Sequence, residues 1–244
     1  NTSVPSATHI EKPVGERASG DFIAALHDDP EHAIIATYPW TDHGTVDDVF
    51  PAAYKIALRD GRKVQLASAP VRGATFIADH NGVVRFAYSE GDSSTVYYRD
   101  SNEALWQQVV GADSGQTQFV PLMFDRSGAS VYAECPGDAG RGGICRWNVA
   151  SRKLEVLWSA HESNQAELVP TFDGLDAFAI RTTIGRPATV LLDKAAPEAG
   201  ALIAMMKKFP GVDMRIVSAS SDGKKVVFLA SGDDDPGVFY LYDP

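Results

Sequence analysis

A glycine-containing turn recurs along the chain at nearly constant spacing, each time between two strand-like apolar runs. The four clearest copies read ATFIADHNGVVRFAY, PLMFDRSGASVYAEC, LVPTFDGLDAFAI and RIVSASSDGKKVVFLA. Their turn glycines are Gly82, Gly128, Gly174 and Gly223, which are 46, 46 and 49 residues apart. Glycine at such a position indicates a tight hairpin, because glycine adopts positive φ at little steric cost. The spacing predicts one repeated structural unit.

An earlier window, DFIAALHDDPEHAIIATY, has the same shape with Asp28, Asp29 and Pro30 in its turn, which makes five copies. The copies continue with further strand-like runs: AAYKIAL then KVQLA, TVYYRD then LWQQVV, GICRWNV then KLEVLW, and ATVLLD. A four-stranded unit of about 40 to 50 residues is typical of a propeller blade. We therefore expect an all-β fold, a β-propeller of about five visible four-stranded blades over residues 21–244. Residues 1–20 are expected to be a linker or the remnant of a preceding blade.

Two copies depart from the four-stranded pattern. Residues 197–209 place Leu202, Ile203, Met206 and Phe209 at helical spacing before a Pro-Gly stop, which predicts a short helix in place of a fourth strand. The last copy offers GVFYLYD as its third strand and has no run for a fourth. Residues 8–14 are a candidate closing strand for that blade, or part of the preceding-blade remnant.

Composition excludes several classes of function. The formal net charge of -10 and scattered Lys and Arg residues argue against a nucleic-acid surface. No run approaches the roughly 18 apolar residues of a membrane-spanning helix. The first seven residues contain no initiator Met, basic region or apolar region, so we expect an export signal to have been removed or to lie outside this sequence. Periplasmic or secreted localisation is expected, with a cytoplasmic location as the alternative.

The two cysteines, Cys135 and Cys145, flank a Gly-rich loop that brings two strand ends face to face. A cross-strand disulfide is sterically reasonable, and two free buried thiols in a cytosolic protein are the open alternative. A zinc site is disfavoured, because neither cysteine has a second ligand at finger-like spacing.

Signatures of catalysis are missing from the sequence. There is no Gly-x-Ser-x-Gly and no parallel α/β pattern to hold one, so no nucleophile of the hydrolase type is assigned. The loop GDAGRGG lacks the Lys-Ser/Thr pair of a phosphate-binding loop and is interpreted as a hairpin loop. No catalytic residue, cofactor-binding residue or cofactor is predicted.

The histidines and acidic residues of the sequence are candidates for a metal site or for paired catalytic carboxylates. His27 and His32 lie five residues apart beside two aspartates, and a solvated turn is favoured there over a metal site. Residues 233–237, DDDPG, lack the ligand spacing of an EF-hand and are interpreted as a charged turn. A five-bladed glycosidase would gather carboxylates at a central channel, but most acidic residues here belong to turns or strand ends. No metal ligand is predicted.

The window RIVSASSDGKKVVFLASGDDDPGVFYLYD, residues 215–243, resembles the last propeller stretch of the prolyl oligopeptidase (S9) family of serine peptidases, which includes dipeptidyl and acylaminoacyl peptidases. Asp222-Gly223, Asp235-Pro236-Gly237 and the run Tyr240 to Asp243 carry the likeness. The segments TVYYRD with Trp106 and ICRWNV extend it weakly to most of the chain.

The resemblance implies a propeller of seven or eight blades beside an α/β-hydrolase domain that holds the catalytic triad. Nothing of that domain is present, so no catalytic residue carries over and this chain alone is expected to be inactive. The implied role is to gate access and help select peptide substrates, through loops such as those around Arg72 or Arg181. The implied partners are the hydrolase domain of the parent protein and a peptide substrate.

Two other functions stay open: a stand-alone propeller that binds or scaffolds partners, and the glycosidase. A dimer formed through exposed blade edges is a further expectation, because an incomplete ring leaves strand edges that a second chain can cover.

Overall fold

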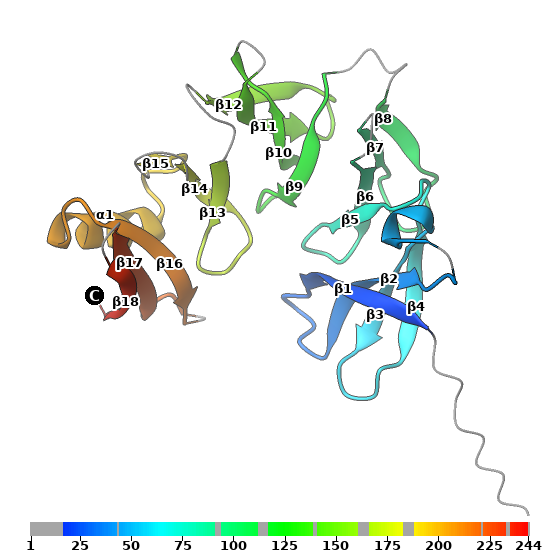
Figure 1. Ribbon diagram of the computed structural model, residues 1–244, viewed down its shortest axis with the longest axis horizontal. Helices are drawn as coiled ribbons and strands as arrows, with labels where there is room; N and C mark the ends of the chain where they lie inside the picture. Colours follow the sequence, from blue (N-terminus) through cyan, green and yellow to red (C-terminus); the bar gives the residue numbers. More distant parts are fainter. Residues whose placement is uncertain are drawn as a thin grey trace, which may run out of the picture.

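The computed structural model describes residues 17–42, 44–90, 94–111, 117–138, 141–160, 166–182, 188–220, 222–232 and 235–243. Within them the chain forms five antiparallel sheets of consecutive strands, numbered here as sheets 1 to 5 in chain order. Figure 1 shows the sheets side by side along an open arc, with the first strand of each toward the inside of the arc. The predicted repeat is confirmed as a repeat of sheets.

Sheets 1, 2 and 3 have four strands each. Sheet 1 contains β1 (Ala18–Ala25), β2 (His32–Pro39), β3 (Ala52–Ala57) and β4 (Lys63–Ser68), with the 3-10 turn η1 (Val46–Asp48) between β2 and β3. Sheet 2 contains β5 (Thr75–Ala78), β6 (Val84–Ser89), β7 (Thr95–Tyr98) and β8 (Gln107–Val110). Sheet 3 contains β9 (Val120–Phe124), β10 (Ser130–Pro136), β11 (Gly142–Asn148) and β12 (Leu154–Ser159).

Sheets 4 and 5 have three strands each, as the two irregular copies predicted. Sheet 4 contains β13 (Ala166–Pro170), β14 (Ala177–Thr182) and β15 (Ala188–Leu191), followed by the helix α1 (Pro197–Lys208). Sheet 5 contains β16 (Asp213–Ala219), β17 (Val226–Gly232) and β18 (Asp235–Tyr242). The first strand begins at Ala18, a little before the predicted boundary at residue 21, and residues 8–14 lie outside the described part of the chain.

The first hairpin of sheets 2 to 5 is built by one set of backbone hydrogen bonds. In sheet 3, the amide of Gly128 donates to the carbonyl of Asp125 at 3.0 Å, and the amide of Asp125 donates to the carbonyl of Ser130 at 2.9 Å. Equivalent bonds close the other three turns, and all four turn glycines have positive φ, 69° at Gly128. The repeated glycine therefore serves the backbone conformation of the hairpin.

Helix α1 takes the place of a fourth strand in sheet 4. Pro197 lies at its start and Lys207 and Lys208 in its last turn, which suits the helix dipole. The predicted apolar stripe is partly wrong, because Ile203 and Met206 are exposed. The residues that are buried are Glu198, Ala199, Ala201, Leu202 and Met205. This buried face packs against β14 and β16.

Three clusters of buried apolar side chains hold neighbouring sheets together. The first joins sheets 1 and 2, around Ile34 and Phe76, and the second joins sheets 2 and 3, around Phe86 and Trp147. The third joins sheet 4, α1 and sheet 5, around Leu202 and Phe228. None of these clusters of described residues spans sheets 3 and 4, so that junction depends on other contacts.

Both ends of the arc present apolar side chains to solvent. Phe22 on β1 is 67% exposed, and Phe239 and Leu241 on β18 are 65% and 64% exposed. On β18 the alternate residues Tyr240 and Tyr242 pack into the third cluster, so Phe239 and Leu241 lie on the opposite face of sheet 5. Exposed aromatic side chains on a sheet face indicate a surface that another element covers.

Candidate functional site

The polar residues of the hairpin turns are used to build the turns. Asp79 accepts hydrogen bonds from the amides of Asn81 and Val83, each at 3.0 Å, and Asp125 accepts from the amide of Ser130 at 3.2 Å. The first turns of sheets 2 and 4, with Asp79 and Asp173, line a cavity of about 330 Å³ together with the ends of β1, β5 and β9.

Three of the polar side chains that line this inner cavity, Asp79, His80 and Asp173, already have partners. His80 contacts the carbonyl of Asp125 through Nε2 at 3.0 Å, and Asp173 is bound by Arg126. Paired-carboxylate chemistry needs two carboxylates that converge on a substrate. The two carboxylates of the cavity lining, Asp79 and Asp173, are instead taken up by backbone amides and by Arg126, so the geometry lends the glycosidase no support.

Arg72 and Arg181 lie at the same end of the sheets, opposite the glycine turns. Arg72, in the connection from β4 to β5, donates to the carbonyl of Asp48 at 2.6 Å and lies over the ring of Phe50. Arg181, near the end of β14, is 5% exposed. It donates to Glu167 at 2.6 Å and to both carboxylate oxygens of Asp213 in sheet 5. Arg181 therefore joins sheets 4 and 5, and each of its three guanidinium nitrogens donates to a carboxylate.

His27 lies in the predicted turn between β1 and β2, and His32 is the first residue of β2. His32 Nδ1 lies 2.7 Å from Asp29 Oδ1, and Lys55 donates to Asp29 Oδ2 at 2.6 Å. The ammonium of Lys55, with His32, lowers the pKa of Asp29 below its ordinary value. Among the described residues, no group of three His, Cys, Asp or Glu side chains is placed to hold a metal ion.

The junction of sheets 3 and 4 is polar. Arg126, in the first turn of sheet 3, donates to both carboxylate oxygens of Asp173 in the first turn of sheet 4, at 2.6 and 3.0 Å. Tyr132 on β10 donates to Asp176 at 2.9 Å. Burial raises the pKa of Tyr132 and the bond to Asp176 raises it further, so the phenol stays a donor. A cavity of about 600 Å³ lies beside these groups.

A third cavity, of about 240 Å³, lies at the opposite end of sheet 3. The strand register places Val120, Glu134, Ile144 and Trp158 in one row across all four strands, and all four line this cavity. Residues in one cross-strand row share a face of the sheet. We call these four residues the sheet-3 row.

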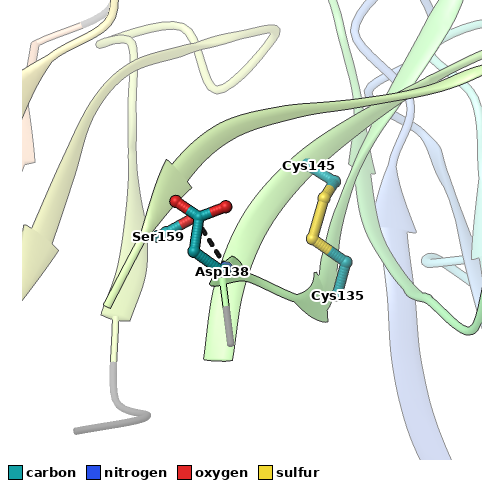
Figure 2. Close-up of a disulfide and its surroundings, with 4 residues drawn as sticks. All are labelled: Cys135, Asp138, Cys145 and Ser159. Atoms are coloured by element: carbon teal, nitrogen blue, oxygen red, sulfur yellow. Dashed lines mark hydrogen bonds between the residues drawn. A yellow bond between two sulfur atoms is a disulfide. The ribbon is translucent and has the colours of Figure 1, made fainter. Parts of the chain in front are cut away.

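Cys135 and Cys145 form a disulfide beside this cavity, as Figure 2 shows. They lie in the neighbouring strands β10 and β11, with Cα atoms 6.0 Å apart. Both sulfurs belong to the apolar cluster between sheets 2 and 3, on the other side of β10 and β11 from the sheet-3 row. The amide of Asp138, after β10, also donates to Ser159 Oγ at 3.2 Å, which ties the loop to the end of β12 (Figure 2).

The polar junction and the sheet-3 row are not predicted from the sequence. Aligning the turns DRSG and TFDG would have shown opposite charges, Arg126 and Asp173, in consecutive copies. The row depends on a β-bulge that shifts the register between Tyr132 and Ala133, and no sequence signal marks that shift.

Comparison with solved structures shows the same architecture in three proteins. A prolyl endopeptidase matches with a TM-score of 0.53 at 13% identity, over 93% of this chain and 33% of its own. TolB from Acinetobacter baumannii matches with a TM-score of 0.51 at 14% identity, over 93% of this chain and 52% of its own. The chain has a β-propeller fold. Prolyl oligopeptidase B from Galerina marginata matches this propeller with a TM-score of 0.51 at 14% identity, over 89% of this chain and 31% of its own.

The propeller spans about half the length of TolB and about a third of the two prolyl peptidases. No family model matches its sequence, and no curated protein matches it significantly. No helix in the described part of the propeller is long and apolar enough to cross a membrane.

The segments that resemble the prolyl oligopeptidase family form structural parts of the propeller. Trp106 donates to the carbonyl of Ser68 at 2.9 Å, and the guanidinium of Arg99 lies 4.4 Å from the centre of its ring. Arg99 also donates to the carbonyl of Leu66 at 3.1 Å. These residues fasten sheet 2 to sheet 1.

Proposed function

We propose that this chain is the propeller portion of a serine peptidase of the prolyl oligopeptidase type, in which it gates access to a hydrolase domain and helps to select peptide substrates. The observation that carries the proposal concerns the last sheet. The segment that resembles the end of the family's propeller, residues 215–243, folds as β16 to β18 in an arc whose structural neighbours include two prolyl peptidases.

The exposed ends of the arc support a larger ring. Phe22 at one end and Phe239 and Leu241 at the other lie on sheet faces that no described element covers. Burying a phenylalanine stabilises a protein by about 2 to 3 kcal/mol, so such faces are normally packed against a neighbour. Further blades of the parent protein, giving seven or eight in all, would cover them. A second copy that packs against the exposed face of β18 is the alternative cover.

A stand-alone binding or scaffolding propeller is the second candidate function. The likeness to TolB favours it, because TolB matches nearly the whole chain with a TM-score of 0.51 and is not a prolyl peptidase by name. The disulfide is consistent with either candidate in the periplasm or outside the cell, since disulfides persist in oxidising compartments.

The coding sequence that follows Pro244 separates the two candidates. The peptidase proposal expects a Gly-x-Ser-x-Gly in an α/β pattern, and a stop codon at that point would favour the binding propeller. The full-length gene product should then hydrolyse short chromogenic peptides, lose this activity when the motif serine is changed to alanine, and leave a folded protein substrate intact. The isolated chain should hydrolyse none of them, and hydrolysis by the isolated chain would refute the assignment.

Light scattering on the purified chain tests whether a second copy of the chain covers the exposed ends of the arc. A dimer that dissociates when Phe239 and Leu241 are both changed to serine would place the partner on β18. A monomer at all concentrations would leave further blades as the cover.

A further inference from the structure

The cavity at the end of sheet 3 has the size of a single side chain. Its volume of about 240 Å³ lies below the roughly 300 to 1,000 Å³ of sites that enclose a whole small molecule. Its lining is mainly apolar, with Phe119, Val120, Ile144 and the partly buried ring of Trp158. It therefore fits an aliphatic or aromatic group that projects from a larger ligand.

A carboxylate lies at the same cavity. Glu134, in the middle of the sheet-3 row, is exposed and makes no ion pair with any residue that the structure describes. Burial raises the pKa of Tyr88, and the negative charges of Glu90 and Glu134 raise it further. Negative charge beside an apolar cavity favours a ligand that carries a positive charge next to its apolar group.

The position of the cavity agrees with a ligand that reaches the inside of the arc. Val120 is the first residue of β9 and Ala166 is the first residue of β13, and these are the inner strands of sheets 3 and 4. Both residues line the cavity at the end of the sheets where Arg72 and Arg181 also lie. A chain that enters at this end passes the cavity.

We infer that this cavity binds an extended peptide segment, with one apolar side chain inserted against Ile144 and Trp158 and an adjacent lysine or arginine paired with Glu134. The inference rests on the proposed function, because it names the class of peptide that the propeller would select. Binding by this chain alone is measurable without any hydrolase domain, so the two proposals can fail separately.

Fluorescence anisotropy with three labelled hexapeptides tests the inference. The probes are Gly-Gly-Leu-Lys-Gly-Gly, the same peptide with Ala for Leu, and the same peptide with Glu for Lys. Replacing Leu by Ala should weaken binding about tenfold, because the apolar contact is lost. Replacing Lys by Glu should weaken binding at least as much. Added salt should narrow the difference in affinity between the Leu-Lys peptide and the peptide with Glu for Lys.

Two variants, each with a matched control, locate the site. Ala166→Trp fills the cavity and should weaken binding of the Leu-Lys peptide about tenfold, whereas Ala204→Trp on the exposed face of α1 should not change it. Glu134→Gln should weaken binding up to about fivefold and reduce its salt dependence. Glu31→Gln, an exposed carboxylate in the turn at the other end of sheet 1, is its control.

Trp158 gives a second measurement, which is made first on the wild-type chain. The Leu-Lys peptide should change the tryptophan fluorescence of the wild-type chain, and Trp158→Phe should abolish that change while Trp40→Phe retains it. Equal binding of the Leu and Ala peptides, or undiminished binding by a folded Ala166→Trp chain, would overturn the inference. If the chain binds the peptide but the full-length product is no peptidase, the cavity stands and the peptidase assignment fails. If the full-length product is a peptidase but its propeller does not bind the peptide, the peptidase assignment stands and the inference about the cavity fails.

Discussion

Arg126 and Asp173 join the first turns of two consecutive repeats through a two-point contact, with both guanidinium Nη atoms bound to the two carboxylate oxygens at 2.6 and 3.0 Å. The pair bridges sheets 3 and 4, the one junction between consecutive sheets in the described chain that no cluster of buried apolar residues spans. A polar contact thus stands where the other junctions have apolar packing.

Arg126→Ala should lower the free energy of unfolding by about 1 kcal/mol at pH 7. The estimate is modest because the Arg126 side chain is 51% exposed and solvent screens the pair. The guanidinium of Arg126 holds the pKa of Asp173 below its ordinary value, so the stabilisation is fully present above about pH 4 and is lost as the pH falls through the lowered pKa. Urea unfolding of both proteins at pH 7 and pH 3 measures the difference, which should shrink at pH 3.

Arg62→Ala is the matched control for that prediction. Arg62 forms an ion pair with Asp60 at 2.7 Å within one turn, and its side chain is 86% exposed. Its loss should cost less than about 0.5 kcal/mol, because the pair joins no two sheets. Equal effects of the two substitutions would show that the junction gains nothing from the pair.

The sequence predicts the local elements of this fold well, because each hairpin is encoded by its own turn. The strands and turns follow from the spacing of the glycines and from the strand-like apolar runs on either side of them. Helix α1 follows from apolar residues at helical spacing and from the Pro and Gly residues at its ends. The face that α1 buries is less predictable. Ile203 and Met206 are apolar yet exposed, and the buried face of α1 carries Ala199 and Leu202 instead.

Contacts between repeats are the part that sequence reasoning does not reach. The loop around Arg181 is predicted as one that gates access, but Arg181 itself lies on β14 and is buried, bonded to Glu167 and Asp213, which lie 14 and 32 residues away in the chain. The cavity beside Glu134 likewise needs four strands in one register. Such contacts depend on how separate sheets and strands meet, which no local pattern records.

Arg181→Met should be the most damaging of these charge substitutions. It leaves the carboxylate of Asp213, which is 16% exposed, without its main partner, and breaking a buried pair in this way costs about 3 to 5 kcal/mol. Arg215→Met is the matched control, because Arg215 lies 3.6 Å from the same carboxylate but is 53% exposed. Its cost should stay below about 1 kcal/mol in urea unfolding.

A double substitution separates the buried charge from the lost arginine packing. Arg181→Met with Asp213→Asn removes the uncompensated charge, and it should recover part of the stability that Arg181→Met loses. A double variant less stable than the single one would contradict this account of the contact.

Two glycine-to-alanine substitutions should have opposite signs. Gly128 has φ of 69° with open space around an added Cβ, so Gly128→Ala should cost about 1 kcal/mol through backbone strain alone. Gly200 lies within α1, also in open space, and Gly200→Ala should stabilise the protein by about 0.5 to 1 kcal/mol. Thermal unfolding of the two variants compares them directly, and a stabilising Gly128→Ala would exclude the turn geometry described here.

Reduction of the Cys135–Cys145 disulfide should destabilise the propeller without unfolding it. The bridge closes a short loop, with a sequence separation of 10, and constraining such a loop contributes about 2 to 3 kcal/mol on the chain-entropy estimate. Cys145 is fully buried and Cys135 is 7% exposed, so reduction of the folded protein should be slow and should accelerate in mild denaturant. Alkylation followed by mass measurement gives the reduced fraction, and urea unfolding gives the stability of each form.

The Cys135→Ser/Cys145→Ser chain is the control, because its stability should not respond to reductant. A wild-type chain whose stability is unchanged after both thiols are alkylated would show that the apolar cluster between sheets 2 and 3 holds this hairpin without the bridge.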